Sequence, residues 1–98
     1  MRTITFDIEK ANAVEHAVCE VFDCRVSEIV SLKDTLVKKV VVFILLEYCG
    51  YDKRVSGYYY QMSYLYVPTV VAEMEYLIRT VPAFETKIKN VYEKILDC

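Results

Sequence analysis

The segment that most constrains the fold is an uninterrupted apolar run of seven residues, Val40–Leu46, near the middle of the chain. The run lies between a pair of lysines and Glu47, and it is far shorter than the roughly 20 apolar residues that span a bilayer. A run of this length is typical of either a buried helix or a buried strand, which periodicity alone does not distinguish. The lysine pair before it and Gly50 after it favour a helix of about 36–49 that is buried nearly all round.

The size of the chain indicates a single domain, residues 1–98. It has 98 residues with only 2 Gly and 2 Pro, and no linker divides it. Hydrophobic residues make up 55% and mean hydropathy is +0.22, which is high for a soluble domain. Because a domain of this size cannot bury all of that surface, we expect some of it to face solvent or a partner.

Apolar residues recur at helical spacing on both sides of the central run, so we predict an all-α fold, a compact bundle of five or six helices. Pro68 and Pro82 can each begin a helix at its first position. The alternation in residues 1–6 is compatible with an extended segment. The expected helices are 8–23, a short one opened by Ser27 and Glu28, 36–49, 55–62, 68–79 and 82–97.

Two details of side-chain placement also follow from the helical spacing. Ile29, Val30 and Leu32 are expected to form the apolar face of the short second helix. In the first helix, Glu15, His16 and Glu20 are expected to lie off the apolar stripe.

The charge of the chain counts against dedicated nucleic-acid binding. Net charge is −2 and the pI is about 5.4, whereas such proteins are usually basic. The charge is uneven, however: residues 1–32 hold three basic against six acidic side chains, and residues 33–54 hold five against three. Any phosphate-binding face should therefore use basic residues of the second segment, which are Lys33, Lys38, Lys39, Lys53 and Arg54.

The cysteines and the single histidine do not indicate catalysis or metal binding. Cys19, Cys24, Cys49 and Cys98 form no CxxC pair and follow no signal peptide, so we interpret them as reduced thiols in a cytoplasmic protein. His16 lies three residues before Cys19, but a core cysteine and a surface histidine are the favoured interpretation over a reactive pair. His16, Cys19 and Cys24 supply only three soft ligands. We therefore expect no enzyme activity, no cofactor and no metal.

Several positions of the first half of the chain match a known DNA-binding family. They are Val18, Phe22, Val26, Glu28, Ile29 and Ser31, followed by the basic loop and the apolar central helix. Through them, residues 14–79 resemble the C-terminal DNA-binding domain of the bacterial replication initiator DnaA, a Trp-repressor-like helix-turn-helix. The resemblance implies a helix-turn-helix at about 53–79 and contacts with double-stranded DNA through Lys38, Lys39, Lys53, Arg54 and Thr69.

The resemblance weakens where the family contacts DNA. The family signature Asp-His-(Ser/Thr)-Thr-Val corresponds here to residues 66–70, of which only Thr69 and Val70 match. A Gly-Gly-Arg that precedes the signature is replaced by a tyrosine-rich run. Glu73 and Glu75 follow on the same helix and would repel phosphates. For the basic residues, a solvated rim remains the alternative to phosphate binding.

The tyrosines are the second candidate site. Seven of the nine lie between residues 48 and 66, and three are consecutive. Consecutive side chains on a helix point about 100° apart, so at least one must lie at the surface. Interface formation, intramolecular packing and base stacking on single-stranded nucleic acid are the alternatives. We expect at least two of five tyrosines to be exposed in one patch that contacts a protein partner or a second copy: Tyr58, Tyr59, Tyr60, Tyr64 and Tyr66.

Two hypotheses for function follow. The first is a DNA-binding or DNA-associated helix-turn-helix module, which leads by analogy with the usual use of the fold. The alternative is a protein-interaction or homo-oligomerisation module that kept the fold and lost the DNA readout. Neither hypothesis involves a membrane.

Overall fold

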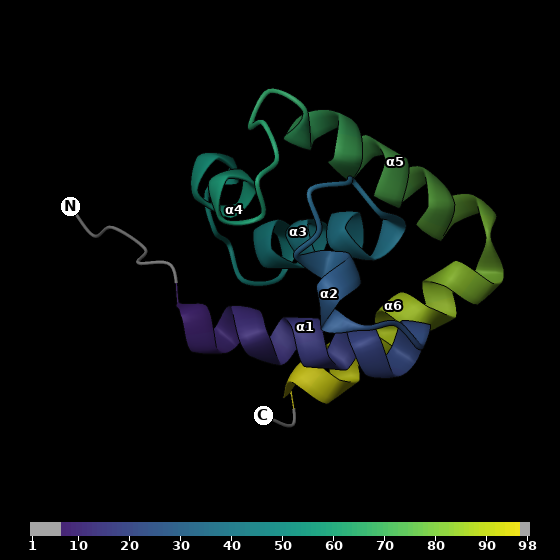
Figure 1. Ribbon diagram of the computed structural model, residues 1–98. Helices are drawn as coiled ribbons and strands as arrows, with labels where there is room; N and C mark the ends of the chain where they lie inside the picture. Colours follow the sequence, from purple (N-terminus) through teal and green to yellow (C-terminus); the bar gives the residue numbers. More distant parts are fainter. Residues whose placement is uncertain (1–6, 97–98) are drawn as a thin grey trace.

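Six helices make up residues 7–96, the part of the chain that the computed structural model describes, and this part contains no strand (Figure 1). The all-α prediction is therefore confirmed. None of these helices is long and apolar enough to cross a bilayer. Residues 1–6, expected to be extended, and residue 97, expected in the last helix, lie outside the described residues. The helices are α1 (Ile8–Phe22), α2 (Val26–Ile29), α3 (Leu36–Glu47), α4 (Lys53–Tyr59), α5 (Val67–Thr80) and α6 (Pro82–Leu96).

The central helix α3 contains the apolar run, as predicted, and contacts α1, α2, α4 and α5 (Figure 1). Residues 40–45 are all buried, on every side of the helix. The β-branched side chains among them lower helix propensity by about 0.5 kcal/mol each, but burying each one stabilises the fold by about 1.5–3 kcal/mol. Tertiary burial therefore decides the conformation. Gly50 follows with φ +73°, the left-handed conformation expected of it.

The helices α1 and α6 lie side by side and close the other side of the core (Figure 1). Ala11, Val14 and Val18 of α1 are fully buried. Phe22 meets Phe84 of α6 edge-on, with ring centroids 5.9 Å apart. The helices α5 and α6 are separated only by Val81, since Pro82 starts the next helix.

The helix α4 begins two residues earlier and ends three residues sooner than the expected 55–62. Asp52 starts it by accepting a hydrogen bond from a backbone N–H of its first turn. Gln61 ends it by adopting φ +57°, which lets the Met62 N–H donate to the carbonyl of Gly57 at 2.7 Å. These end groups, rather than the apolar pattern, set the bounds of α4.

The predicted apolar face of the second helix, Ile29, Val30 and Leu32, is a prediction that the structure largely contradicts. Only Ile29 is buried, while Val30 and Leu32 are exposed. The helix has a single turn, so it directs only one of these side chains into the core. Val30 and Leu32 lie beyond its end, in the loop that leads to α3.

Candidate interaction surface

The helix α4 presents an exposed aromatic face. Val55, Tyr58 and Tyr59 are spaced by three and four residues, so their side chains lie on one side of the helix. All three are exposed, and the Tyr58 side chain is 87% exposed, the most of any large hydrophobic residue described. We call Val55, Tyr58 and Tyr59 the α4 aromatic face.

A surface hollow of about 620 Å³ lies beside this face. It is lined by Tyr58, Tyr59, Gln61 and Met62. Since Met62 is buried and Tyr58 is largely exposed, we place Met62 at the base of the hollow and Tyr58 at its edge. One of the lining residues, Gln61, has the left-handed conformation that ends α4.

The turn that follows α4 adds aromatic and basic groups to the same region. Tyr64 is exposed, and the Arg54 guanidinium lies 4.9 Å from the centre of its ring. A cation over an aromatic face is attracted by the negative charge above the ring. Lys53, also exposed, precedes Arg54 on α4, and Leu65 beside Tyr64 is exposed as well.

Tyr60 departs from the expectation, because it is inside the protein. Its hydroxyl donates to the Glu15 carboxylate at 2.6 Å, and both side chains are buried. Burial, together with this hydrogen bond, raises the pKa of Tyr60 far above its usual value. Glu15, expected off the apolar stripe of α1, is therefore a buried acceptor. No local pattern indicates this pair, since its members are 45 residues apart.

The exposure of at least two of the five tyrosines is confirmed, whereas their contact with a partner stays a prediction. Tyr58, Tyr59 and Tyr64 are exposed, Tyr66 is half-buried and Tyr60 is buried. Of these, Tyr58 and Tyr59 line the same hollow. Tyr66 instead lies near Lys39, with the ammonium group 5.9 Å from its ring centre.

Lys38, expected at a DNA contact, is fully buried. Its ammonium group donates to the Ser31 carbonyl at 2.7 Å and lies 3.8 Å from the Asp34 carboxylate. A buried ammonium needs such partners, because an unpaired charge inside a protein is very costly. Lys38 therefore holds the loop before α3 against that helix, and it does not reach a surface where phosphate could bind.

Lys39 is also engaged within the protein. It pairs with Glu73 of α5 at 3.0 Å, and the hydrogen bond to Glu73 raises the pKa of Lys39. The pair joins α3 to α5 and offsets the positive charge. Of the other residues expected to contact DNA, Lys53, Arg54 and Thr69 are all exposed.

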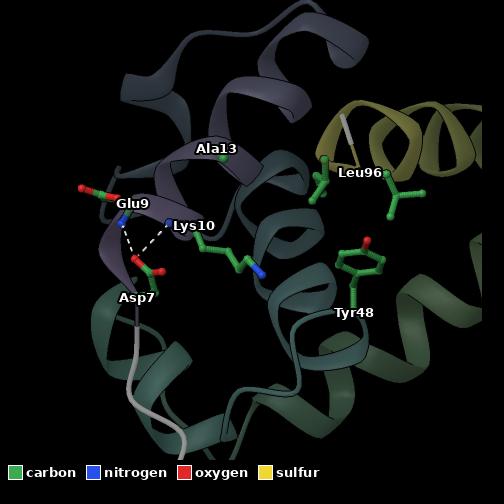
Figure 2. A pocket seen from close by; sticks show the side chains of 7 residues that line it. Asp7, Glu9, Lys10, Ala13, Tyr48 and Leu96 are labelled. Carbon is green, nitrogen blue, oxygen red and sulfur yellow. Dashed lines mark hydrogen bonds between the residues drawn. The ribbon is translucent and has the colours of Figure 1, made fainter. Parts of the chain in front are cut away.

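A second hollow, of about 420 Å³, lies where the start of α1 faces the end of α3 and α6 (Figure 2). Among its lining residues, Asp7 caps α1, because its carboxylate accepts hydrogen bonds from the backbone N–H groups of Glu9 and Lys10 at 2.9 and 3.3 Å. Tyr48, on its other side, stacks on Tyr92 with ring centroids 5.2 Å apart. Asp7 and Tyr48 therefore have structural roles, and we assign the hollow no ligand.

The cysteine and histidine candidates form no metal cluster. Within residues 7–96, no three His, Cys, Asp or Glu side chains gather where they could hold an ion. His16 is exposed, whereas Cys19 is half-buried and contacts the thiol of Cys24.

The most distinctive surface of the described residues is thus the α4 aromatic face with its hollow and the adjacent basic side chains. Exposed tyrosine rings beside basic side chains are typical of protein interfaces and of single-stranded nucleic-acid sites. Comparisons with protein-family models, with curated proteins and with solved structures found no match.

Proposed function

We propose that this chain is a protein-interaction module that associates with a second copy of itself through the α4 aromatic face. The observation that carries the proposal is the position of Tyr58, which is 87% exposed and stands at the edge of a hollow of about 620 Å³. A projecting ring beside a hollow is self-complementary. Two copies related by a two-fold axis can each insert Tyr58 into the hollow of the other.

The side chains of this face suit such a contact energetically. Tyrosine offers a large contact area at a low cost in conformational entropy, and it is frequent among the residues that dominate binding energy. All three side chains of the face are uncharged. Exposed apolar side chains of this kind also account for part of the high hydrophobic content of the chain.

Sedimentation velocity over about 1 μM to about 1 mM protein tests the proposal. We expect a weak, concentration-dependent dimer, because three side chains of one seven-residue helix form a small interface. Replacing the most exposed tyrosine of the face, Tyr58→Ser, should raise the dissociation constant of the dimer at least tenfold, which corresponds to about 1.4 kcal/mol.

The matched control is Tyr76→Ser. Tyr76 is an exposed tyrosine of α5 that does not line the hollow, so its loss should leave the dimer unchanged. A chain that stays monomeric over the whole range contradicts self-association. Equal weakening by both variants contradicts the assignment to α4.

Association with double-stranded DNA is a second candidate, favoured by exposed polar side chains at the starts of two helices. Lys53 and Arg54 lie in the first turn of α4, and Thr69 lies in the first turn of α5. Helix N-termini favour phosphate, and polar side chains there reach base edges in helix-turn-helix proteins. Residues 60–66 connect the two helices.

Association with DNA ranks second because few of the expected basic residues are available to bind phosphate. Lys38 is buried and Lys39 is paired with Glu73, whereas Glu75 is exposed on the helix that would face the duplex. A fluorescence titration with random and initiator-box duplexes at low salt tests it. Binding that weakens steeply with salt and is lost in Lys53→Ser/Arg54→Ser supports it, and no binding at micromolar protein excludes it.

A further inference from the structure

Two cysteine thiols meet where α1 ends. Cys19 lies in the last turn of α1, and Cys24 lies in the connection to α2. The thiol of Cys24 donates a hydrogen bond to the sulfur of Cys19, and the two sulfur atoms are 3.6 Å apart. Both side chains are half-buried, so small solutes can reach them.

The backbone brings these thiols together. Asp23, between them in the sequence, has φ +54° and turns the chain back over the helix end. This turn lets the Cys24 N–H donate to the Cys19 carbonyl at 3.1 Å. The hydrogen-bonded pattern is a common way of ending a helix, and it holds the two residues side by side. The sulfur contact therefore results from the main-chain geometry rather than from the side chains alone.

We propose that Cys19 and Cys24 form a reversible intramolecular disulfide, which makes the end of α1 a redox-sensitive modification site. A disulfide bond is about 2.05 Å long, so the sulfur atoms must approach by about 1.5 Å, a movement within reach of side-chain rotation. The site is separate from the α4 aromatic face and does not depend on the function of that face.

A peroxide is the oxidant class that completes the reaction. The sulfur of Cys19 attacks one peroxide oxygen, giving a sulfenic acid and one water. The sulfur of Cys24 then attacks the sulfenic sulfur, so that the S–S bond forms and a second water leaves. In total, two thiols lose two protons and two electrons, and one hydrogen peroxide becomes two waters. A small dithiol reverses the bond by thiol–disulfide exchange.

The surroundings of the two thiols set the order of these steps. Burial, and to a lesser degree the hydrogen bond to Cys19, raises the pKa of Cys24 to about 12. Cys24 therefore keeps its proton at neutral pH. Because the thiolate is the reactive form and burial disfavours it at Cys24, we assign Cys24 as the resolving thiol. Cys19, whose sulfur accepts the hydrogen bond from Cys24, is then the sulfur that reacts with the oxidant.

Phe22 lies in the loop that the disulfide would close. Its ring contacts that of Phe84 of α6 and lies 5.1 Å from the Lys87 ammonium group. Closing this short loop restricts the unfolded chain while retaining the contact between α1 and α6. We expect the oxidised protein to melt roughly 5 °C or more above the reduced protein.

Peptide mapping of the full chain tests the proposal directly. Trypsin cleaves after Lys10 and Arg25, so one peptide, residues 11–25, holds Cys19 and Cys24, whereas Cys49 and Cys98 fall in two other peptides. After hydrogen peroxide treatment and alkylation, we expect this peptide to be two hydrogens lighter and unalkylated. Dithiothreitol before alkylation should restore two alkylated cysteines and the lower melting temperature.

Two variants serve as controls. Cys24→Ser should remove both the intrapeptide bond and the rise in melting temperature, whereas Cys49→Ser should leave both intact. The proposal is overturned if peptide 11–25 still takes up two alkylating groups after oxidation. It is also overturned if its cysteines are instead oxidised to sulfinic acids or joined to Cys49 or Cys98.

Discussion

At the scale of single residues, Tyr58, Tyr59 and Tyr60 show how the last turn of α4 and the residue after it divide identical neighbours between core and surface. Two are exposed, and the third is buried against Glu15 of α1. Helix geometry requires such a division, because successive side chains point about 100° apart. Which tyrosine points inward depends on the rotation of α4 about its axis, and that is set by packing on α3.

We expect Tyr60→Phe to lower the free energy of unfolding by about 1–3 kcal/mol, because the buried Glu15 carboxylate loses its donor. Urea denaturation measures the change. The matched control, Tyr58→Phe, alters an exposed ring and should stay within about 0.5 kcal/mol of the parent. The double variant Glu15→Met/Tyr60→Phe should recover much of the loss, since it removes both polar groups. Equal stability of the two Phe variants would contradict the role given to the hydrogen bond.

At the scale of secondary-structure elements, the close approach of α4 to the turn after it depends on Gly57. A Cβ atom added at this glycine would lie 2.6 Å from the Met62 carbonyl oxygen, a main-chain atom that cannot move aside freely. The same carbonyl belongs to the turn that lines the hollow beside Tyr58. The helix end and the candidate surface are therefore built by the same few residues.

Gly57→Ala should therefore destabilise the protein by about 1–3 kcal/mol through overpacking. In an ordinary helix the same change stabilises by about 1 kcal/mol, so the sign of the effect is the test. Gly50→Ala offers a comparison, because it adds a Cβ in open space and costs only the left-handed strain of φ +73°, about 1 kcal/mol. A Gly57→Ala variant as stable as the parent in urea would show that the turn can relax.

At the scale of the whole molecule, the bundle buries several groups that must stay protonated. Burial raises the pKa values of Tyr60, Tyr92, Cys24 and Cys49, and the hydrogen bond to Glu73 raises that of Lys39. In each case the folded state holds its proton more tightly than the unfolded chain does. The contribution of each group is complete below the unfolded pKa and is lost as pH rises through the folded pKa.

We therefore expect the free energy of unfolding to fall as the pH rises above the ordinary values of 9.0 for Cys and 10.0 for Tyr. Urea denaturation at pH 8 to pH 11 measures this fall. In Tyr60→Phe, the decline above pH 10 should be shallower by up to about 1.4 kcal/mol per pH unit. A stability that stays constant to pH 11 would contradict the burial of these groups.

Also at this scale, the positions of the helices follow from local signals, whereas several side-chain environments do not. Thr35 and Asp52 cap helices, Pro82 begins one and Gly50 follows another. These signals act over a few residues, so they can be read from the order of the residues alone. The prediction for α4 missed its N-terminal bound because it did not use the Asp52 cap. It missed the C-terminal bound because the run of tyrosines gives no sign of the turn at Gln61.

The sequence by itself determined that this chain is all-α, because the helical periodicity on both sides of Val40–Leu46 and the helix ends are local properties. Tertiary burial decided the helical conformation of Val40–Leu46 itself. Only the tertiary structure decided that Lys38 is buried and that Tyr60 meets Glu15. It also decided that Tyr58 stands at the edge of a hollow. The physical reason is that the free energy of burying a polar group depends on whether a partner arrives from elsewhere in the chain. For the Tyr60 hydroxyl, that partner comes from 45 residues away.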